Sequence, residues 1–389
     1  MPLALDGIRV VDLTQVMAGP FCTMLLGDMG ADVIKVEPPG TGDLSRSMGG
    51  DRLKLEGGDH APFFALNRNK RSMTLDLKRD EDRGVFMSLA RTADVLVENF
   101  RPGVTRRLGV DYESIAPQNP RLIYASISGF GQSGPYADRP GFDLIAQGMS
   151  GIMSVTGEPG GAPVKCGLPI ADLSAGLYAA NGILAALFVR ERTGNGQYVE
   201  TSLFESALAL SLWETAEYWA TGEAPEPMGT AHRLSAPYQV FRTRDGHVTL
   251  AALSDQQWQQ LCRAIDRPGL ATDARFATNG ARMANRPALA REIELALAGR
   301  TTAEWVERLL AAGVPAGPLH DYDQVMNDPH THAREMVEAI DHPVAGTVRT
   351  LGFPVKMTDT PLRTRRPPPL LGEHNAELRR ELGLEPAVP

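Results

Sequence analysis

The chain reads IRVVDLTQVMAGPFCTMLLGDMGADVIKVE over residues 8–37, and this stretch decides the fold. The apolar, β-branched run at 8–13 predicts a buried strand, and Gly19 lies in the break that follows it. Residues 21–29 predict an apolar helix, and residues 31–37 predict a second buried strand. A strand-helix-strand unit with a glycine-containing turn after its first strand is typical of a site for a nucleotide or its phosphates.

Strands and helices continue to alternate as far as about residue 220. The pattern predicts helices at 80–92 and from about 172 to 192, and further strands at 72–77, 94–98, 121–128 and 197–203. After the last of these strands a helix is predicted to run on to about residue 220. Near-continuous apolar strands that alternate with helices indicate an α/β fold. We expect a large Rossmann-like domain whose parallel sheet is covered by helices on both faces.

The composition changes at residues 221–227, a linker rich in Pro, Glu and Gly. The hairpin and three helices predicted after it indicate a small α+β domain. We therefore expect a large α/β domain over 1–220 and a small domain over 225–330. Residues 331–389 are expected to form a C-terminal segment that returns to the large domain or to a partner subunit. Short strands are predicted in it near 347–349 and 355–357.

Composition narrows the possible functions. The 389 residues are 43% hydrophobic with a net charge of −8, and no long basic run is present, so we expect no nucleic-acid partner. The apolar runs are interpreted as too short to span a bilayer, so no membrane contact is expected. Three widely spaced cysteines predict a protein of a reducing compartment, the cytoplasm. The histidines show no metal-ligand pattern, so no metal site is expected.

The nucleotide motifs in the chain are incomplete. The dinucleotide fingerprint needs three glycines in the turn, and the loop after the first strand supplies only Gly19. Glu37 ends the second strand, where it could bind a ribose or be an exposed strand end. The P-loop pattern is absent from the sequence, and so is the Gly-x-Ser-x-Gly motif of serine hydrolases.

Asp172 is the strongest candidate for covalent chemistry. It follows an apolar stretch and opens the long helix, where free N–H groups and the helix dipole would keep it ionised. An ionised, partly desolvated carboxylate can act as a nucleophile. The alternative is a helix N-cap, a position that Asp favours. Asp143 precedes another predicted helix and has the same two interpretations.

The chain resembles the class III CoA-transferases of the CaiB/BaiF family, which includes formyl-CoA transferase, carnitine CoA-transferase and the α-methylacyl-CoA racemases. The resemblance covers essentially the whole chain and rests on motifs in order: GIRVVDL at 7–13, AGP at 18–20, GADVIKVE at 30–37, NKRS at 69–72, VENFRPG at 97–103, GFD at 141–143, ADL at 171–173, TGNGQ at 193–197 and PPPLLGEH at 367–374. Residues 228–232 (MGTAH) and 237–239 (PYQ) most resemble enzymes that move CoA between succinyl-CoA and dicarboxylates such as glutarate.

The resemblance implies a CoA-transferase of the EC 2.8.3 type, without a tightly bound cofactor, that moves CoA from an acyl-CoA to a small carboxylic acid. Asp172 would form a mixed anhydride with the acyl group and then an aspartyl-CoA thioester. By the same resemblance, CoA would be bound by Val16, Met17, Ala18, Leu75, Asn99, Phe100, Val104 and Arg107. Family members form interlocked homodimers, in which each chain passes through a ring formed by its partner. In this chain, residues 221–227 and the segment after Asp328 would be the segments that pass through.

The sequence departs from the family at two places. Some transferases have a phosphate-binding Arg at the position of Pro38, and we expect Lys70 or Arg71 to take over that role. The racemases have a His at the position of Phe142, so racemisation would lack one acid/base partner. A racemase or isomerase, and a non-catalytic CoA-binding protein in which Asp172 is only a helix cap, remain alternatives. Arg46 is a further hypothesis, as a residue that binds the acceptor carboxylate.

Overall fold

The structure is a computed structural model, and it describes residues 3–384. The chain divides into two compact units. The first unit contains the residues up to Met153, the segment Lys165–Thr221 and the residues from His330 onward. The second unit contains Ser154–Val164 and Gly222–Pro329. The first of these segments interrupts the sequence of the first unit but belongs to the second.

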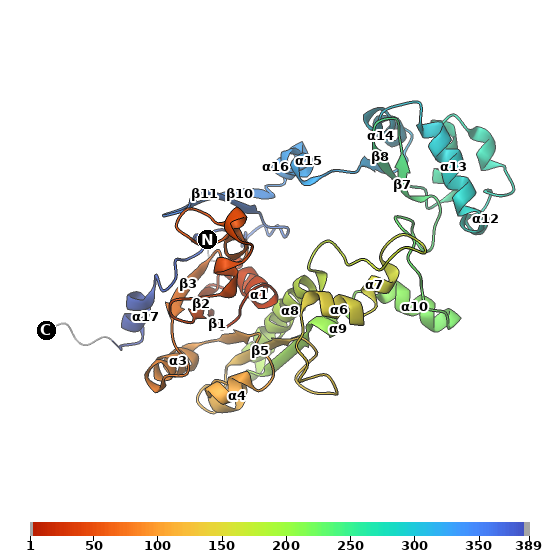
Figure 1. Cartoon of the computed structure of the whole chain (residues 1–389). Coiled ribbons are helices and arrows are strands. Elements are labelled where there is room, and N and C mark those ends of the chain that lie inside the picture. The colour runs from red at the N-terminus through yellow and green to blue at the C-terminus, as the bar shows by residue number, and fades with distance from the viewer. Residues whose placement is uncertain (1–2, 385–389) are drawn as a thin grey trace. The chain divides into compact units, whose positions relative to one another are not determined.

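The first unit is built on a six-stranded sheet in which every pair of neighbouring strands is parallel (Figure 1). Across the sheet the order is β3-β2-β1-β4-β5-β6. The strands are β1 (Arg9–Asp12), β2 (Asp32–Glu37), β3 (Lys70–Thr74), β4 (Val95–Glu98), β5 (Ile123–Ser128) and β6 (Tyr198–Ser202). The predicted α/β fold with a parallel sheet is confirmed.

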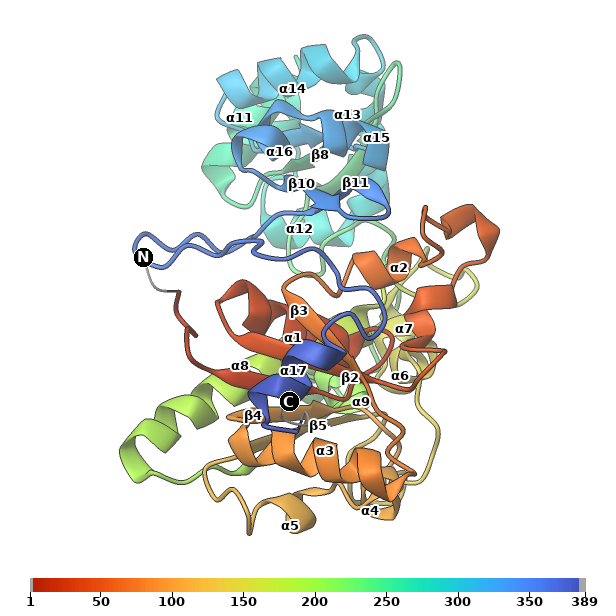
Figure 2. The same cartoon turned by 90° about the vertical axis from the view of Figure 1, so that its left-hand side faces the viewer.

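Helices cover both faces of this sheet. On one face α1 (Ala18–Asp28) and α8 (Ile170–Thr193) pack together over residues such as Val10. On the other face α3 (Asp80–Thr92), α5 (Tyr112–Ile115) and α17 (Asn375–Glu381) pack over residues such as Val11, and Figure 2 shows α17 on this side. Successive side chains of a strand point to opposite faces, so apolar runs without alternation are what a sheet covered on both sides requires.

The length of α8 corrects one expectation. By length and composition it is the one helix among the described residues that could cross a membrane. The interpretation that every apolar run is too short was therefore wrong. In the structure α8 packs against α1, β5 and β6, and its apolar composition is what a core helix between a sheet and other helices requires.

The second unit combines a small antiparallel sheet with helices. Its strands are β7 (Tyr238–Arg242), β8 (His247–Ala251) and β9 (Ala316–Pro318), in the order β7-β8-β9. The helices α11 (Asp255–Ala264), α13 (Arg286–Leu297) and α14 (Thr302–Ala311) enclose a core that includes Trp258 and Trp305. This unit has its own apolar core.

The C-terminal residues of the first unit run back along its sheet. A hairpin of β10 (Val337–His342) and β11 (Gly346–Leu351) leads to an arm whose Arg366 carbonyl accepts a hydrogen bond from the Asn69 N–H at 3.0 Å. The strand predicted at 355–357 is wrong, because those residues pair with no strand among the described residues.

The remaining elements are short. They are α2 (Ala61–Phe64), α4 (Val104–Leu108), α6 (Asp143–Met149), α7 (Ile152–Val155), α9 (Leu203–Leu208), α10 (Leu212–Thr221), α12 (Asn279–Ala284), α15 (Tyr322–Asn327), α16 (Pro329–Ala333), and the 3₁₀ turns Leu44–Ser47, Asp51–Leu53 and Pro268–Ala271.

Candidate functional site

The sheet has a switch point between β1 and β4. The chain proceeds outward from β1 through β2 to β3 on one side and from β4 through β5 to β6 on the other. In open parallel sheets of this kind, ligands bind outside the carboxyl ends of the strands where the order reverses. The loops after β1 and β4 therefore define the candidate site of the first unit.

All eight residues predicted to contact CoA follow strands at this carboxyl edge. They are Val16, Met17 and Ala18 after β1, Leu75 after β3, and Asn99, Phe100, Val104 and Arg107 after β4. The Arg107 side chain is exposed, as a phosphate ligand would need to be. The Leu75 side chain lies in the core instead, with 2% of its surface exposed.

The two loops are joined by hydrogen bonds. Asn99 Oδ1 accepts from the Gln15 N–H and Asn99 Nδ2 donates to the Gln15 carbonyl, both at 2.8 Å. The next residue, Val16, has a φ of 71°, a conformation that costs free energy for a β-branched residue. Gly19 lets the loop lie against α1, because a Cβ there would sit 2.3 Å from Thr14 Cβ.

The packing of α8 on α1 brings Asp172 to the same region. One turn beyond Asp172, Gly176 lies so close to the Ala18 carbonyl that a Cβ would approach its oxygen to 2.7 Å. The first turn of α8 is thus held beside the loop that contains Val16, Met17 and Ala18. The structure thereby joins a predicted nucleophile to predicted CoA contacts more than 150 residues earlier in the sequence.

Asp143, and not Asp172, caps α8. Asp143 Oδ1 accepts hydrogen bonds from the Ala171 N–H at 2.9 Å and the Asp172 N–H at 3.4 Å, and Gln147 Nε2 donates to Asp143 Oδ2 at 2.7 Å. The N-cap position is Pro169, and Asp172 lies two residues inside the helix. The interpretation of Asp172 as the helix cap is therefore wrong, because a second carboxylate already occupies that role.

The electrostatics of Asp172 also correct the sequence analysis. Burial and the negative charge of Asp143 raise its pKa to about 7, whereas the helix end was expected to keep it ionised. The Asp172 carboxylate makes no hydrogen bond or ion pair within the described part of the chain. The free N–H groups that would have stabilised its charge already bind Asp143.

Sequence reasoning missed a second perturbed carboxyl group, Glu98, which ends β4. It accepts hydrogen bonds from Ser126 Oγ and from the Phe100 N–H, the latter at 2.8 Å. Burial raises its pKa to about 7, although these two hydrogen bonds act in the opposite direction. Its position directly before the predicted CoA contacts Asn99 and Phe100 was the available signal.

The basic residues expected to replace a phosphate-binding Arg are already engaged. Lys70 is fully buried, and its Nζ donates to Asp12, Asn67 and the Pro20 carbonyl at 2.8–3.0 Å. The Arg71 guanidinium pairs with Asp32, Glu377 and Glu381. Both expectations are wrong, because these side chains join buried strands to each other and to the C-terminal helix.

Glu37 and Arg46 form a buried ion pair. Arg46 donates to both Glu37 oxygens at 2.8 Å, to Asp59 at 2.5 Å and to the Pro369 carbonyl at 3.1 Å. Only 2% of Glu37 and 4% of Arg46 is exposed. Glu37 is therefore not an exposed strand end, and Arg46 has no free edge with which to bind an acceptor carboxylate.

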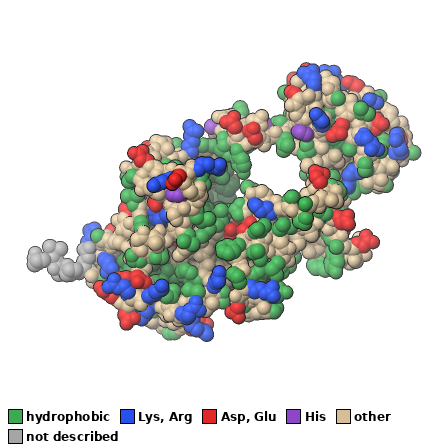
Figure 3. Space-filling model, viewed as in Figure 1, with side chains coloured by type: hydrophobic (Ala, Val, Ile, Leu, Met, Phe, Trp, Pro, Cys, Tyr) green, Lys and Arg blue, Asp and Glu red, His purple; other side chains and the backbone are tan. Residues whose placement is uncertain are grey.

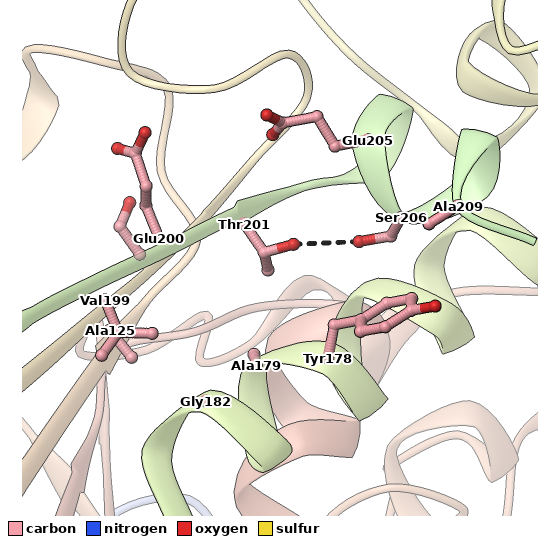
Figure 4. A pocket seen from close by; sticks show the side chains of 11 residues that line it. Ala125, Tyr178, Ala179, Gly182, Val199, Glu200, Thr201, Glu205, Ser206 and Ala209 are labelled. Atoms are coloured by element: carbon pink, nitrogen blue, oxygen red, sulfur yellow. Dashed lines mark hydrogen bonds between the residues drawn. The ribbon is translucent and has the colours of Figure 1, made fainter. Parts of the chain in front are cut away.

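A cavity of about 310 Å³ lies elsewhere in the first unit, between β5, β6, α8 and α9 (Figure 4). Tyr178, Glu200 and Glu205 line it, and the hydroxyls of Thr201 and Ser206 are hydrogen bonded at 2.9 Å. None of the predicted site residues lines it, so it does not belong to the candidate site.

The described residues contain no cluster of three or more His, Cys, Asp or Glu side chains placed to hold a metal ion. Cys22, Cys166 and Cys262 are free thiols.

The fold and the candidate site define a doubly wound α/β protein whose ligand edge lies beside a half-buried carboxylate, Asp172, without a hydrogen-bond partner among the described residues. The model of CoA-transferase family III matches residues 5–375, and the chain belongs to this family. It is 46% identical to the succinyl-CoA:mesaconate CoA-transferase of Haloarcula hispanica, over 98% of this chain and 97% of that protein. It is 44% identical to the acetyl-CoA:oxalate CoA-transferase of Acetobacter aceti, over 97% and 95%.

A solved structure agrees with this assignment. The crystal structure of a CaiB/BaiF family protein from Brucella suis superposes with a TM-score of 0.88 at 41% identity, covering 98% of this chain and 100% of that one. The family expected from the sequence motifs is confirmed, and with it CoA transfer to a carboxylic acid as the class of reaction.

Proposed function

We propose that the chain transfers CoA from an acyl-CoA to a dicarboxylic acid, with Asp172 as the nucleophile. The observation that carries the proposal is the half-buried Asp172 carboxylate, which has no partner among the described residues and lies beside the loop after β1. A carboxylate stripped of hydrogen bonds and partly desolvated is a stronger nucleophile than one in water.

The reaction proceeds in two symmetrical halves. The Asp172 carboxylate attacks the thioester carbonyl, the C–S bond breaks, and CoA leaves as a thiolate, giving a mixed anhydride. The thiolate attacks the aspartyl carbonyl of the anhydride, which releases the donor acid and forms an aspartyl-CoA thioester. The acceptor carboxylate then displaces the thiolate to form a second anhydride. The thiolate attacks the acceptor's acyl carbon, which frees Asp172 and the new acyl-CoA.

The CoA moiety is held by the residues after β1 and β4. The backbone of Val16, Met17 and Ala18 forms one wall, Phe100 adds a half-buried apolar surface, and the exposed Arg107 pairs with a phosphate. The Asn99 amide contributes by fixing Gln15, since both ends of that amide are bound to the Gln15 backbone. No cofactor other than the CoA substrates takes part.

A dicarboxylate acceptor is supported by the relatives. The two curated relatives above are named for mesaconate and for oxalate, which, like glutarate, are dicarboxylic acids, whereas their donors differ. Succinyl-CoA is the donor we would test first. Racemisation is disfavoured because Phe142, which precedes Asp143, is a hydrocarbon side chain that cannot carry a proton.

The protein is proposed to work as an interlocked homodimer in the cytoplasm. Large apolar side chains are exposed on several helices of the first unit, and Figure 3 shows such side chains gathered over α6 and α10. They include Phe142, Leu144, Phe188, Leu212, Trp213 and Trp219. Exposed apolar surface on this scale is typical of an interface. Sedimentation as a stable monomer would contradict the dimer.

Trapping tests the chemistry. Purified protein is mixed with succinyl-CoA and hydroxylamine, which converts an aspartyl anhydride or thioester into a hydroxamate, and peptides are mapped by mass spectrometry. We expect the label on Asp172, and its absence in Asp172→Asn together with a loss of CoA exchange of roughly a thousandfold or more. An unlabelled Asp172 and a fully active Asp172→Asn would overturn the assignment. A panel of mono- and dicarboxylates then identifies the acceptor.

A further inference from the structure

A buried network of charged side chains lies beneath the loop after β1. Asp12, Lys35, Asp43 and Lys70 form its ion pairs, and none of these side chains is accessible to solvent. Removing charges from water is costly, and buried ion pairs can often be replaced by apolar residues without loss of stability. The position of the network under the candidate site therefore points to a role beyond stability.

Asp12 and Lys35 hold Thr14, the second residue of the loop after β1. Asp12 Oδ1 accepts from the Thr14 N–H at 2.8 Å and from the Thr14 hydroxyl at 2.5 Å, while Lys35 Nζ donates to the Thr14 carbonyl at 2.8 Å. The N–H, the hydroxyl and the carbonyl of Thr14 are therefore all hydrogen bonded to Asp12 or Lys35. The loop leaves β1 in one defined direction.

Asp43 holds the strained residue of the loop. Its Oδ1 accepts from the Val16 N–H at 3.1 Å and from the Ser45 N–H at 2.8 Å, and its Oδ2 pairs with Lys35 Nζ at 2.8 Å. Val16 is a β-branched residue at a φ of 71°, which persists only where surrounding contacts impose it. Asp43 is the one side chain of the described residues that binds the Val16 backbone.

We propose that Asp43, fixed by Lys35, is a positioning residue that holds Val16 in the left-handed region and so presents residues 16–18 to CoA. This inference rests on the proposed function, because it assumes that CoA binds at this loop. The Val16 N–H is committed to Asp43 and cannot bind the ligand. The network fixes the conformation of residues 16–18 before CoA binds, so this part of the site is preorganised.

The proposal predicts which property each variant changes. Asp43→Ala removes the bond to Val16 and leaves Lys35 without this partner. Asp43→Asn keeps an oxygen for Val16, but it removes the charge and replaces the oxygen that faces Lys35 with an NH2 group. We expect the Kd for free CoA to rise roughly tenfold in Asp43→Ala and about threefold in Asp43→Asn. The KM for the acceptor acid should stay within about twofold of wild type, because the acceptor does not depend on this wall.

A double-mutant cycle separates positioning from general damage. Val16→Gly removes the steric cost of a positive φ, so the loop no longer depends on Asp43 to impose it. The effect of Asp43→Ala on CoA affinity should therefore be smaller in the Val16→Gly background than in wild type. Additive effects in the cycle would contradict the proposed link between Asp43 and Val16.

The matched control is a buried ion pair at the other end of α1. Asp28 accepts from Arg68 Nε at 2.9 Å and Nη2 at 2.7 Å, and is as buried as Asp43. Asp28→Asn should lower the melting temperature and leave the Kd for CoA unchanged. Titration calorimetry with free CoA on the folded full-length proteins measures the Kd of the Asp43 variants and of Asp28→Asn. If wild type binds no CoA, the proposed function fails; if wild type and Asp43→Ala bind it equally, only this inference fails.

Discussion

Asp12 and Asp172 are two carboxylates of the first unit with opposite environments. Asp12 ends β1, is fully buried, and receives hydrogen bonds from Thr14, Thr23 and Lys70. Burial alone would raise its pKa, but Lys35, Lys70 and the two hydroxyls hold it well below its usual range. Asp172 has no such partner, and burial with the charge of Asp143 raises its pKa to about 7.

The difference separates a carboxylate that holds the loop after β1 in place, Asp12, from the carboxylate that we propose as the nucleophile, Asp172. A carboxylate with every lone pair occupied is a fixed anchor, and it is a poor nucleophile because its electrons are committed to hydrogen bonds. A carboxylate without partners is unstable in its ionised form and gains free energy when it forms a neutral ester or anhydride. The following variants test this contrast in order of the expected size of the effect.

The largest effect is expected from removing the anchor. Asp12→Ala leaves Lys70 buried without a counter-charge and frees both Thr14 and Thr23, so we expect a loss of about 3–5 kcal/mol in the free energy of unfolding. Urea titration followed by circular dichroism measures it. Asp12→Asn, which keeps one acceptor oxygen, should lose less. A cost below about 1 kcal/mol would mean that Asp12 is not an anchor.

Removing the charge of Asp172 should raise the free energy of unfolding, whereas removing Asp12 lowers it. Because the pKa of Asp172 is raised from 3.8 to about 7 in the folded protein, its contribution to stability is present below pH 4 and is lost as the pH rises through 7. Asp172→Asn should therefore be inactive yet more stable than wild type at pH 8, by about 2–4 kcal/mol. The gain should vanish near pH 4.

Melting temperatures of both proteins at pH 4.5, 6 and 8 give this comparison. A destabilised Asp172→Asn at pH 8 would show that the Asp172 carboxylate has a stabilising partner and belongs with Asp12, not opposite it.

The charge of Asp143 raises the pKa of Asp172, and removing it is expected to have an effect of intermediate size. Asp143→Asn keeps an oxygen that can cap α8 and removes the negative charge that raises the pKa of Asp172. The acidic limb of the kcat/KM–pH profile, near pH 7 in wild type, should move to lower pH by up to about one unit. A limb that stays in place would assign the raised pKa to burial alone.

The fold was largely predictable because its elements are local and apolar. The helix at 80–92 was predicted with the bounds it has in the structure, since its first turn is acidic and its apolar spacing is regular. The strand at 355–357 failed because a strand needs a partner, and a short apolar run does not identify one. The helix predicted from 203 to about 220 is broken into α9 and α10 at residues 209–211.

The positions of the candidate residues were more predictable than their electrostatics. The start of the long helix and the family resemblance singled out Asp172, but its pKa depends on Asp143, which lies 29 residues earlier and takes the helix N–H groups. Lys70, Arg71 and Arg46 were interpreted as ligand-binding cations because a sequence does not reveal which carboxylates a folded chain brings to them.

Glu98 should give the smallest effect, and it tests whether the contrast extends to a third carboxyl group. Like Asp172 it is buried with a pKa raised to about 7, but like Asp12 it is hydrogen bonded, to Ser126 and to the Phe100 N–H. At pH 4.5 nearly all folded molecules would carry Glu98 protonated, so Glu98→Gln there replaces a neutral group by another of nearly the same shape. We expect a change below about 1 kcal/mol in stability at pH 4.5 and less than threefold in the KM for acyl-CoA. Ser126→Ala, which removes one of its donors, is the matched variant and should raise that pKa further. A large loss of activity in Glu98→Gln with unchanged stability would instead place Glu98 beside Asp172 as a second reacting carboxylate.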